Sequence, residues 1–253
     1  MKIAAVQLNS QHDIAANLGQ MLDWMSTAIA QHSPDLIALP EYALCLSGDR
    51  AVACAGAQSL DASPVLQRLA DFSRAHRVYV HLGSVVERAV DGRFYNTSLV
   101  FNPAGRCVSA YRKIHLFEVA ADHDSLDSVV HCETAFLSPG KSVETFAVGT
   151  CIVGHSICYD LRFPSLYDKL HAQGARLMMA PSAFTYASGK KDWARLMRAR
   201  AQQTGSYLVG ANQCGSYDNG RFSSWGHTMI VDPQGDIVAE CGDEPGMIAA
   251  ALA

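Results

Sequence analysis

The feature that most constrains this chain is an internal repeat of its apolar segments. Three segments of the first half return in the second half, in the same order and at offsets of 141, 128 and 130 residues. The pairs are 36–40 with 177–181, 78–83 with 206–210, and 98–106 with 228–236. Each member of the third pair has the pattern of a strand, an Asx-Pro-x-Gly turn and a second strand. The repeat predicts two halves of similar build.

The rest of the pattern is typical of an α/β chain, because short β-rich runs alternate with longer helical segments. Strands are expected at 3–8, 36–39, 78–86, 97–101, 107–112, 143–148, 151–158, 177–180, 207–212, 227–231 and 237–240. Helices are expected at 13–31, 64–76, 165–173 and 193–203. Two sheets that pack face to face, each covered by helices on its other side, give a four-layer α-β-β-α sandwich with an internal pseudo-two-fold repeat. We expect residues 1–253 to form one such domain.

Composition excludes several classes of protein. The formal net charge is −4, without the basic excess of nucleic-acid-binding domains. The longest apolar runs, such as 207–211, are far shorter than the roughly 18 residues that a membrane span needs, and the first residues lack a signal-peptide core. We therefore expect a cytoplasmic protein. Charged residues are only 17% of the chain, which favours a homodimer or a larger homo-oligomer.

Cysteine and histidine spacing gives no sign of a metal site. The eight cysteines include no C-x-x-C pair, and none of the ten histidines has H-x-x-x-H or H-E-x-x-H spacing. Free thiols in a reducing compartment are expected, and a redox or metal protein is disfavoured. We predict no metal.

Three chemically distinct side chains stand at the carboxyl ends of expected strands, where α/β sheets place their ligands. They are Glu41, Lys113 and Cys158. A thiol with a pKa of roughly 8.5 must lose its proton to attack, and Glu41 could take that proton. Lys113 and the Tyr159 backbone N–H could stabilise an oxyanion. By residue type alone, a buried structural thiol, a surface carboxylate and a solvated lysine remain the alternatives.

At these positions the sequence resembles the nitrilase superfamily of carbon–nitrogen hydrolases. Three segments are similar to its catalytic motifs and occur in its order: Leu-Pro-Glu at 39–41, Tyr-Arg-Lys-Ile-His-Leu at 111–116 and Cys-Tyr-Asp-Leu-Arg-Phe-Pro at 158–164. Further similarity lies at 181–184, 198–201 and 225–228. The resemblance implies that Glu41 is the general base, Lys113 the stabiliser of the intermediate and Cys158 the nucleophile. It implies no cofactor.

The resemblance also implies a second glutamate, six residues before a Pro-Gly pair. Glu133, followed by Pro139 and Gly140, fits this pattern and would orient Lys113 or the attacking water. The alternative is a carboxylate on a surface loop. The preceding segment 118–132 is expected to be a surface loop that borders a pocket. Asp160 and Arg162 are expected to form a structural pair beneath the nucleophile.

The nucleophile motif resembles the amidase branch, because Cys158 is followed by Tyr-Asp where true nitrilases have Trp-Glu. The resemblance implies hydrolysis of an amide of a small carboxylate-bearing molecule to an acid and ammonia. Segments 181–184 and 212–215 look most like amidases of deaminated glutathione. The alternatives are an ω-amidase of 2-oxoglutaramate and 2-oxosuccinamate, and a catalytically silent binding or assembly protein of the same fold.

A substrate carboxylate calls for an arginine or for backbone donors. Arg162, Arg195 and Arg198 are the candidates, and the last two share one face of the expected helix; the alternative for that pair is a solvated face or a subunit contact. The pocket is further expected to be lined by Tyr159, Phe117, Ser182, Phe184 and Trp193.

Overall fold

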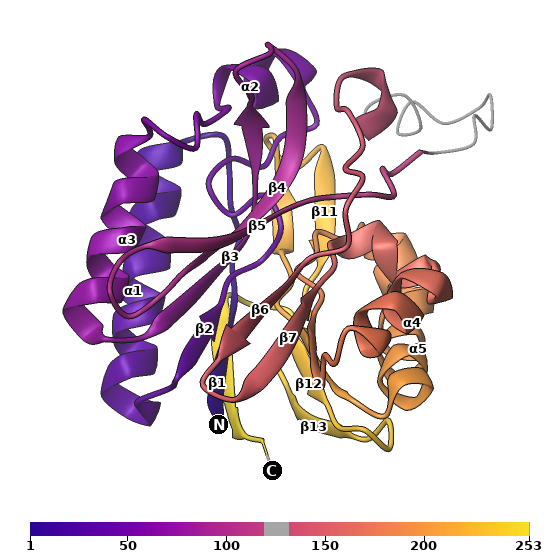
Figure 1. The fold of residues 1–253 in the computed structure, drawn as a ribbon. Helices are drawn as coiled ribbons and strands as arrows, with labels where there is room; N and C mark the ends of the chain where they lie inside the picture. Colours follow the sequence, from indigo (N-terminus) through magenta and orange to yellow (C-terminus); the bar gives the residue numbers. More distant parts are fainter. Residues whose placement is uncertain (119–131, 253) are drawn as a thin grey trace.

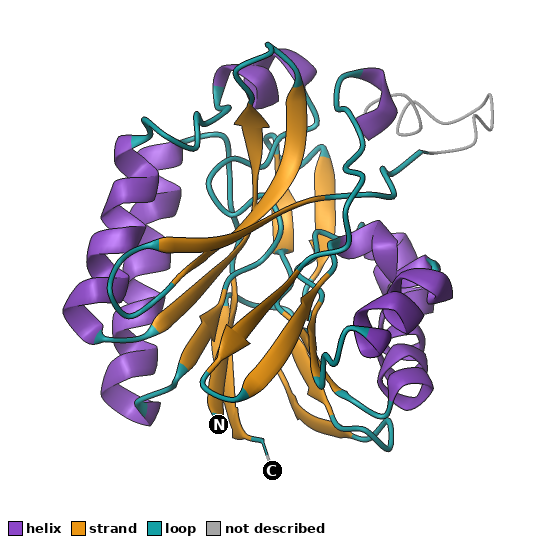
Figure 2. Ribbon diagram, in the orientation of Figure 1, coloured by secondary structure: helices purple, strands orange, loops and turns teal. Residues whose placement is uncertain are grey.

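The computed structural model describes residues 1–118 and 132–252. Two six-stranded sheets pack face to face, with helices over both outer faces (Figure 1, Figure 2). The first sheet has the order β14-β1-β2-β3-β4-β5. Its strands are β1 (Lys2–Gln7), β2 (Leu36–Ala38), β3 (Tyr79–Arg88), β4 (Phe94–Phe101), β5 (Cys107–Arg112) and β14 (Gly246–Ala251). The expected loop at 118–132 lies almost wholly outside the described residues.

The second sheet has the order β13-β12-β9-β8-β7-β6. Its strands are β6 (Thr145–Val148), β7 (Cys151–His155), β8 (Leu177–Met179), β9 (Tyr207–Gly210), β12 (Met229–Val231) and β13 (Ile237–Glu240). The helices are α1 (Ile14–His32), α2 (Arg50–Ala55), α3 (Pro64–His76), α4 (Pro164–Ala172) and α5 (Tyr186–Thr204). Helices α1 and α3 cover the first sheet, and α4 and α5 cover the second (Figure 1). No described helix is long and apolar enough to cross a membrane.

The two sheets have the same internal pattern, which confirms the repeat. Read from β14 across the first sheet and from β6 across the second, the five pairings run antiparallel, parallel, parallel, antiparallel, antiparallel in both sheets. The turns after β4 and β12 are stabilised by the same pattern of hydrogen bonds. The side chain of Asn102 accepts from Ala104 and Arg106 N–H, and that of Asp232 accepts from Gln234 and Asp236 N–H. An Asx side chain that satisfies two backbone donors explains why both turns carry this residue type.

Apolar residues fill all three spaces between the four layers. Ile3 and Leu36 of the first sheet pack on Val153 and Leu177 of the second, forming the central layer. The outer layers join α1 and α3 to the first sheet and α4 and α5 to the second. Each fully buried Leu, Ile or Val contributes roughly 1.5–3 kcal/mol. Both sheets therefore share one continuous set of packed layers, which positions the strand ends that carry the site.

Several elements differ from the sequence-based expectation. Helix α5 begins at Tyr186, seven residues earlier than expected, because Thr185 caps it by accepting from Ser188 N–H. Helix α2, strand β14 and the hairpin of β10 (Cys214–Tyr217) with β11 (Phe222–Trp225) were not expected. Strand β14 is Gly- and Ala-rich, and it forms because β1 offers it an edge with which to pair.

Candidate active site

Three strand ends bring Glu41, Lys113 and Cys158 to one pocket. Glu41 follows β2, Lys113 follows β5, and Cys158 begins a 3₁₀ turn after β7. Two of these strands belong to the first sheet and one to the second. The pocket therefore lies at one end of the sandwich, between the sheets, and it exists only when both halves are folded together.

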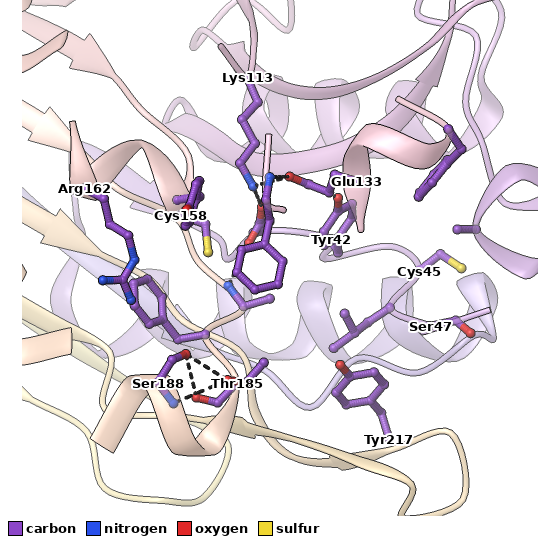
Figure 3. Close-up of a pocket in the computed structure, with 18 residues that line it drawn as sticks. Tyr42, Cys45, Ser47, Lys113, Glu133, Cys158, Arg162, Thr185, Ser188 and Tyr217 are labelled. Carbon is purple, nitrogen blue, oxygen red and sulfur yellow. Dashed lines mark hydrogen bonds and ion pairs between the residues drawn. The ribbon is translucent and has the colours of Figure 1, made fainter. Parts of the chain in front are cut away.

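Lys113 is enclosed by two carboxylates. Its Nζ lies 2.8 Å from Glu41 Oε1 and 2.8 Å from Glu133 Oε2 (Figure 3). Only 1% of the Lys113 side chain is exposed, so the ammonium must be paired. Glu133 is thus buried in the cluster and is not a surface carboxylate. The cluster of two carboxylates and one ammonium carries a net charge of −1.

The Pro-Gly pair after Glu133 anchors its segment to the lysine strand. Gly140 N–H donates to the Lys113 carbonyl at 2.8 Å. A Cβ on Gly140 would lie 1.9 Å from the Arg112 carbonyl oxygen, so only glycine permits this approach. The spacing between Glu133 and Gly140 therefore has a local reason: it ties the second carboxylate to the backbone of Lys113.

Cys158 has a left-handed backbone, with φ of 48°. The turn is held from below by Asp160, which accepts hydrogen bonds from Ile157 N–H, Tyr111 Oη and His115 N–H. The expected pair of Asp160 with Arg162 is wrong. Arg162 points the other way and pairs with Asp192 of α5 at 2.9 Å, because Asp160 is enclosed in the core, whereas Arg162 lies on the pocket wall.

Two further residues join the carboxylates, and the sequence reasoning missed both. Tyr42 Oη donates to Glu133 Oε1. Asn96 Nδ2 donates to Glu41 Oε1 at 2.9 Å and to Glu133 Oε1 at 2.8 Å. The position of Tyr42 directly after Glu41 was an available signal. The only signal for Asn96 was that a polar residue stands at the edge of an apolar strand.

Burial and charge set the protonation of the cluster. Burial raises the pKa of Glu41, and the negative charge of Glu133 raises it further, while Lys113 opposes both. The pKa of Glu133 is lowered, because Lys113 and the Phe117 N–H outweigh the effect of its burial. Burial alone would lower the pKa of Lys113, but the surrounding negative charges raise it well above its usual value.

Burial favours the neutral, protonated form of the Cys158 thiol. Its burial and the neighbouring charge of Glu41 raise its pKa well above the usual value, against the effect of Lys113. Glu41 is held by Lys113 Nζ on Oε1 and by the Ala183 N–H on Oε2, at 2.9 Å. The geometry places a fixed carboxylate with a raised pKa beside a neutral thiol, which is the arrangement that general-base activation of a thiol requires.

The pocket has two arms on either side of Cys158. In the view of Figure 3, Arg162, Thr185 and Ser188 lie on one side of the thiol. The other side carries Cys45, Ser47 and Tyr217. Leu46, which clusters with Tyr217, and Ala53 and Phe136, which cluster with Tyr42, also line the pocket.

Most of the expected lining residues reach this pocket. Phe117, Tyr159, Arg162 and Phe184 line it. Ser182 does not: it is fully buried, and its hydroxyl donates to the Ala180 carbonyl. In an extended segment, successive side chains point to opposite faces, so Ser182 points into the core and Ala183 lines the pocket. The Ala183 N–H donates to Glu41 Oε2.

The remaining candidates lie elsewhere. Trp193 is in the core and donates to the His227 carbonyl. Arg195 pairs with Asp192, and Arg198 Nε donates to the Gly235 carbonyl in the turn after β12. Neither arginine lines the pocket. Within residues 1–118 and 132–252, no three His, Cys, Asp or Glu side chains are grouped as metal ligands.

The fold and the site define a four-layer α/β protein with a buried carboxylate–ammonium–thiol cluster between its sheets. The chain belongs to the carbon-nitrogen hydrolase family, which it matches over residues 2–253. It is 35% identical to the omega-amidase NIT2 of Homo sapiens, over 72% of this chain and 64% of that protein. It is also 35% identical to the human deaminated glutathione amidase, over 74% of this chain and 58% of that protein.

A solved structure supports the same assignment. Saccharomyces cerevisiae Nit3, described as a member of branch 10 of the nitrilase superfamily, superposes with a TM-score of 0.87 at 30% identity. The match covers 99% of this chain and 89% of Nit3. The chain spans about half to two thirds of the length of the first curated relatives that it matches.

Proposed function

We propose that the protein is a thiol-dependent amidase formed by a single carbon–nitrogen hydrolase domain over residues 1–253. The observation that carries the proposal is the Glu41 carboxylate, fixed by Lys113 and the Ala183 N–H beside the neutral Cys158 thiol. A thiol and a positioned base in one buried site are the parts that acyl transfer needs.

The reaction follows from these groups. Cys158 Sγ bonds to the amide carbon while Glu41 takes the thiol proton, and Lys113 with the Tyr159 N–H stabilises the negative oxygen. Glu41 then gives the proton to the amide nitrogen, and the C–N bond breaks. The amine departs, and the acyl group stays bound to Cys158 as a thioester. Water, deprotonated by Glu41, adds to the thioester. The C–S bond then breaks, the acid leaves, and Glu41 returns the proton that it took from water to Cys158 Sγ. Glu133 orients Lys113 throughout.

The arm at α5 suits a substrate carboxylate. Arg162 lines it with 30% of its side chain exposed. Asp192 is shared between Arg162 and Arg195, so the three side chains retain a net charge of +1. The N-terminus of the 19-residue helix α5 lies at the same place, with Thr185 and Ser188 in the wall. A net positive charge and a helix N-terminus both attract an anion.

We propose deaminated glutathione as the substrate. Its amide links a 2-oxoglutaryl group to cysteinylglycine, so the leaving amine is a dipeptide rather than the ammonia expected from the sequence. The arm on the far side of Cys158, lined by Leu46, Ala53 and Phe136, offers room for such a leaving group. Equal identity, 35%, to human omega-amidase NIT2 favours 2-oxoglutaramate as the second candidate.

One assay separates the two substrates, because both release 2-oxoglutarate. We expect higher kcat/KM on deaminated glutathione than on 2-oxoglutaramate, and no turnover by Cys158→Ala. The reverse preference makes the protein an ω-amidase. If neither substrate is hydrolysed and intact-mass spectrometry finds no acyl adduct on Cys158, the result supports a binding protein instead.

The far arm can be tested by filling it. Ala53 of α2 is buried in the pocket wall, whereas Ala51 on the same helix is exposed. We expect Ala53→Phe to lower kcat/KM for deaminated glutathione by roughly tenfold or more, with little change for 2-oxoglutaramate. Ala51→Phe should change neither. Equal losses on both substrates with Ala53→Phe contradict the assignment of this arm to the leaving group.

We also propose that the protein works in the cytoplasm as a homodimer or a larger homo-oligomer. The scattered spacing of its eight cysteines and its low content of charged residues support this. Light scattering of the purified protein measures the oligomeric state, and a monomer at micromolar concentration contradicts the second part.

A further inference from the structure

Asn96 contacts all three charged members of the buried cluster. It lies on β4 and is fully buried. Its Nδ2 donates one hydrogen to Glu41 Oε1 and the other to Glu133 Oε1. Its backbone carbonyl accepts from the Lys113 N–H at 2.8 Å. One residue therefore fixes both carboxylates and the backbone of the lysine between them.

The orientation of the Asn96 amide is determined by its neighbours. An ionised carboxylate can only accept hydrogen bonds, so the NH₂ group must face Glu41 and Glu133. A reversed amide would place its oxygen against two carboxylate oxygens. Asn96 Oδ1 is buried, and it has no hydrogen-bond partner among the described residues. The side chain is thus placed for its two donors.

An asparagine at position 96 favours the ionised form of both neighbouring carboxylates without adding charge. Two buried carboxylates share one ammonium, and each disfavours the ionisation of the other. A hydrogen bond donated to the ionised form favours that form, and asparagine supplies two without adding charge. An aspartate of the same shape would add a third acid, and a second lysine would neutralise the charge of the base.

We propose that Asn96 is a positioning residue that sets the separation of Glu41 and Glu133, so that both stay proton acceptors around one lysine. This rests on the proposed function, in which Glu41 receives the thiol proton. The titratable groups that act on Glu41 come from several elements around it, and these are Lys113, Glu133, Cys158, Tyr42 and Tyr217. Asn96 acts on Glu41 from β4, where it is the uncharged member of the set.

The test compares two near-isosteric variants, Asn96→Asp and Asn96→Leu, in the pH dependence of kcat/KM. Both remove donors from Glu41, so we expect the acid limb of the profile to move up by about one pH unit. The kcat at neutral pH should fall by roughly tenfold or more, with KM within about threefold, because Asn96 does not line the pocket. An acid limb at the wild-type position in both variants overturns the proposal.

The matched control is Thr97→Val on the same strand. Thr97 is equally buried, and its hydroxyl donates to Glu87 Oε2, on the side away from the pocket. The variant loses a buried hydrogen bond and should lose thermal stability, but its pH profile should match that of wild type. A shift in Thr97→Val as large as that in Asn96→Asp would mean that general loosening of β4 causes the effect, and it would overturn the proposal.

A second readout does not depend on turnover. The rate of alkylation of Cys158 by iodoacetamide, followed by peptide mass spectrometry across pH, reports proton transfer from the thiol directly. We expect slower labelling at neutral pH in both Asn96 variants and an unchanged rate in Thr97→Val. If wild type hydrolyses neither substrate, the proposed function fails while the labelling still tests Asn96. If Asn96→Leu does not fold, Asn96→Ser, which keeps one donor, should give an intermediate shift; a wild-type labelling profile in the folded variants overturns the proposal.

Discussion

Two residues of the site hold backbone conformations that L-residues rarely adopt. Cys158 has φ of 48°, and Tyr42, directly after Glu41, has φ of 54°. Such conformations cost on the order of 1–3 kcal/mol each, and they persist only where the surroundings impose them. Cys158 N–H donates to the Pro181 carbonyl, and Tyr42 N–H donates to Ser84 Oγ. Strain therefore lies next to both the thiol and the carboxylate, as expected where side-chain direction matters more than local stability.

Replacing Glu41 with glutamine tests the role of its charge. Glutamine keeps the shape but cannot take the thiol proton, so Glu41→Gln should lower kcat by roughly two orders of magnitude or more, with the fold intact by circular dichroism. Glu87→Gln is the control, because Glu87 is a buried carboxylate that pairs with Arg112 and does not line the pocket. If Glu41→Gln changes only KM, Glu41 binds substrate and is not the base.

At the scale of elements, short connecting segments position the side chains of the site. The segment from Glu133 to Gly140 is an irregular stretch that begins with one 3₁₀ turn, Glu133–Ala135. It is fixed at one end by Phe117 N–H on Glu133 Oε2 and at the other by Gly140 against Arg112. These two anchors hold Glu133 in the buried cluster although it lies on an irregular segment.

The anchoring predicts that Gly140→Ala is harmful. The added Cβ would lie 1.9 Å from the Arg112 carbonyl oxygen, so the segment must move. We expect a loss of about 1–3 kcal/mol in the free energy of unfolding and at least a tenfold lower kcat. Gly19→Ala in α1 is the control: nothing lies within 4 Å, and alanine should stabilise the helix by up to about 1 kcal/mol. Urea unfolding and kinetics measure both, and full activity in Gly140→Ala contradicts the anchoring role.

At the scale of the whole molecule, a pair of buried histidines joins the two sheets. His81 of β3 and His155 of β7 approach to 3.4 Å, between their hydrogen bonds to Ser98 and Ser109. Burial lowers the pKa of His81 to about 3. Burial, followed by the proximity of His81, lowers the pKa of His155 well below its usual value. Burial therefore favours the neutral form of both rings.

The pair predicts loss of stability in acid. The usual pKa of histidine is 6.5, so below this pH the histidines of the unfolded chain bind protons. In the folded protein His81 binds a proton only near its lowered pKa of about 3. Stability contributed by each histidine is therefore present above pH 6.5 and is lost as pH falls, by about 1.4 kcal/mol per pH unit. His155→Gln should reduce this slope in urea unfolding at pH 5 to 7. Exposed His76→Gln should not, and equal slopes in His155→Gln and wild type contradict the prediction.

The sequence by itself determined what is encoded locally. The repeat predicted two similar sheets, because strand and turn signals act over a few residues. The three motifs placed Glu41, Lys113 and Cys158 at strand ends, and the structure brings these ends together in one pocket. Their chemical roles remain predictions.

The tertiary structure alone decided which groups meet. Asn96 and Tyr42 join the cluster because β4 and the turn after β2 face the same space. Arg162 takes Asp192 rather than Asp160 as its partner, because the packing of α5 sets the direction of that side chain. Ser182 points into the core while the next residue's N–H faces Glu41. Such choices depend on contacts between segments far apart in the chain, and local sequence does not encode them.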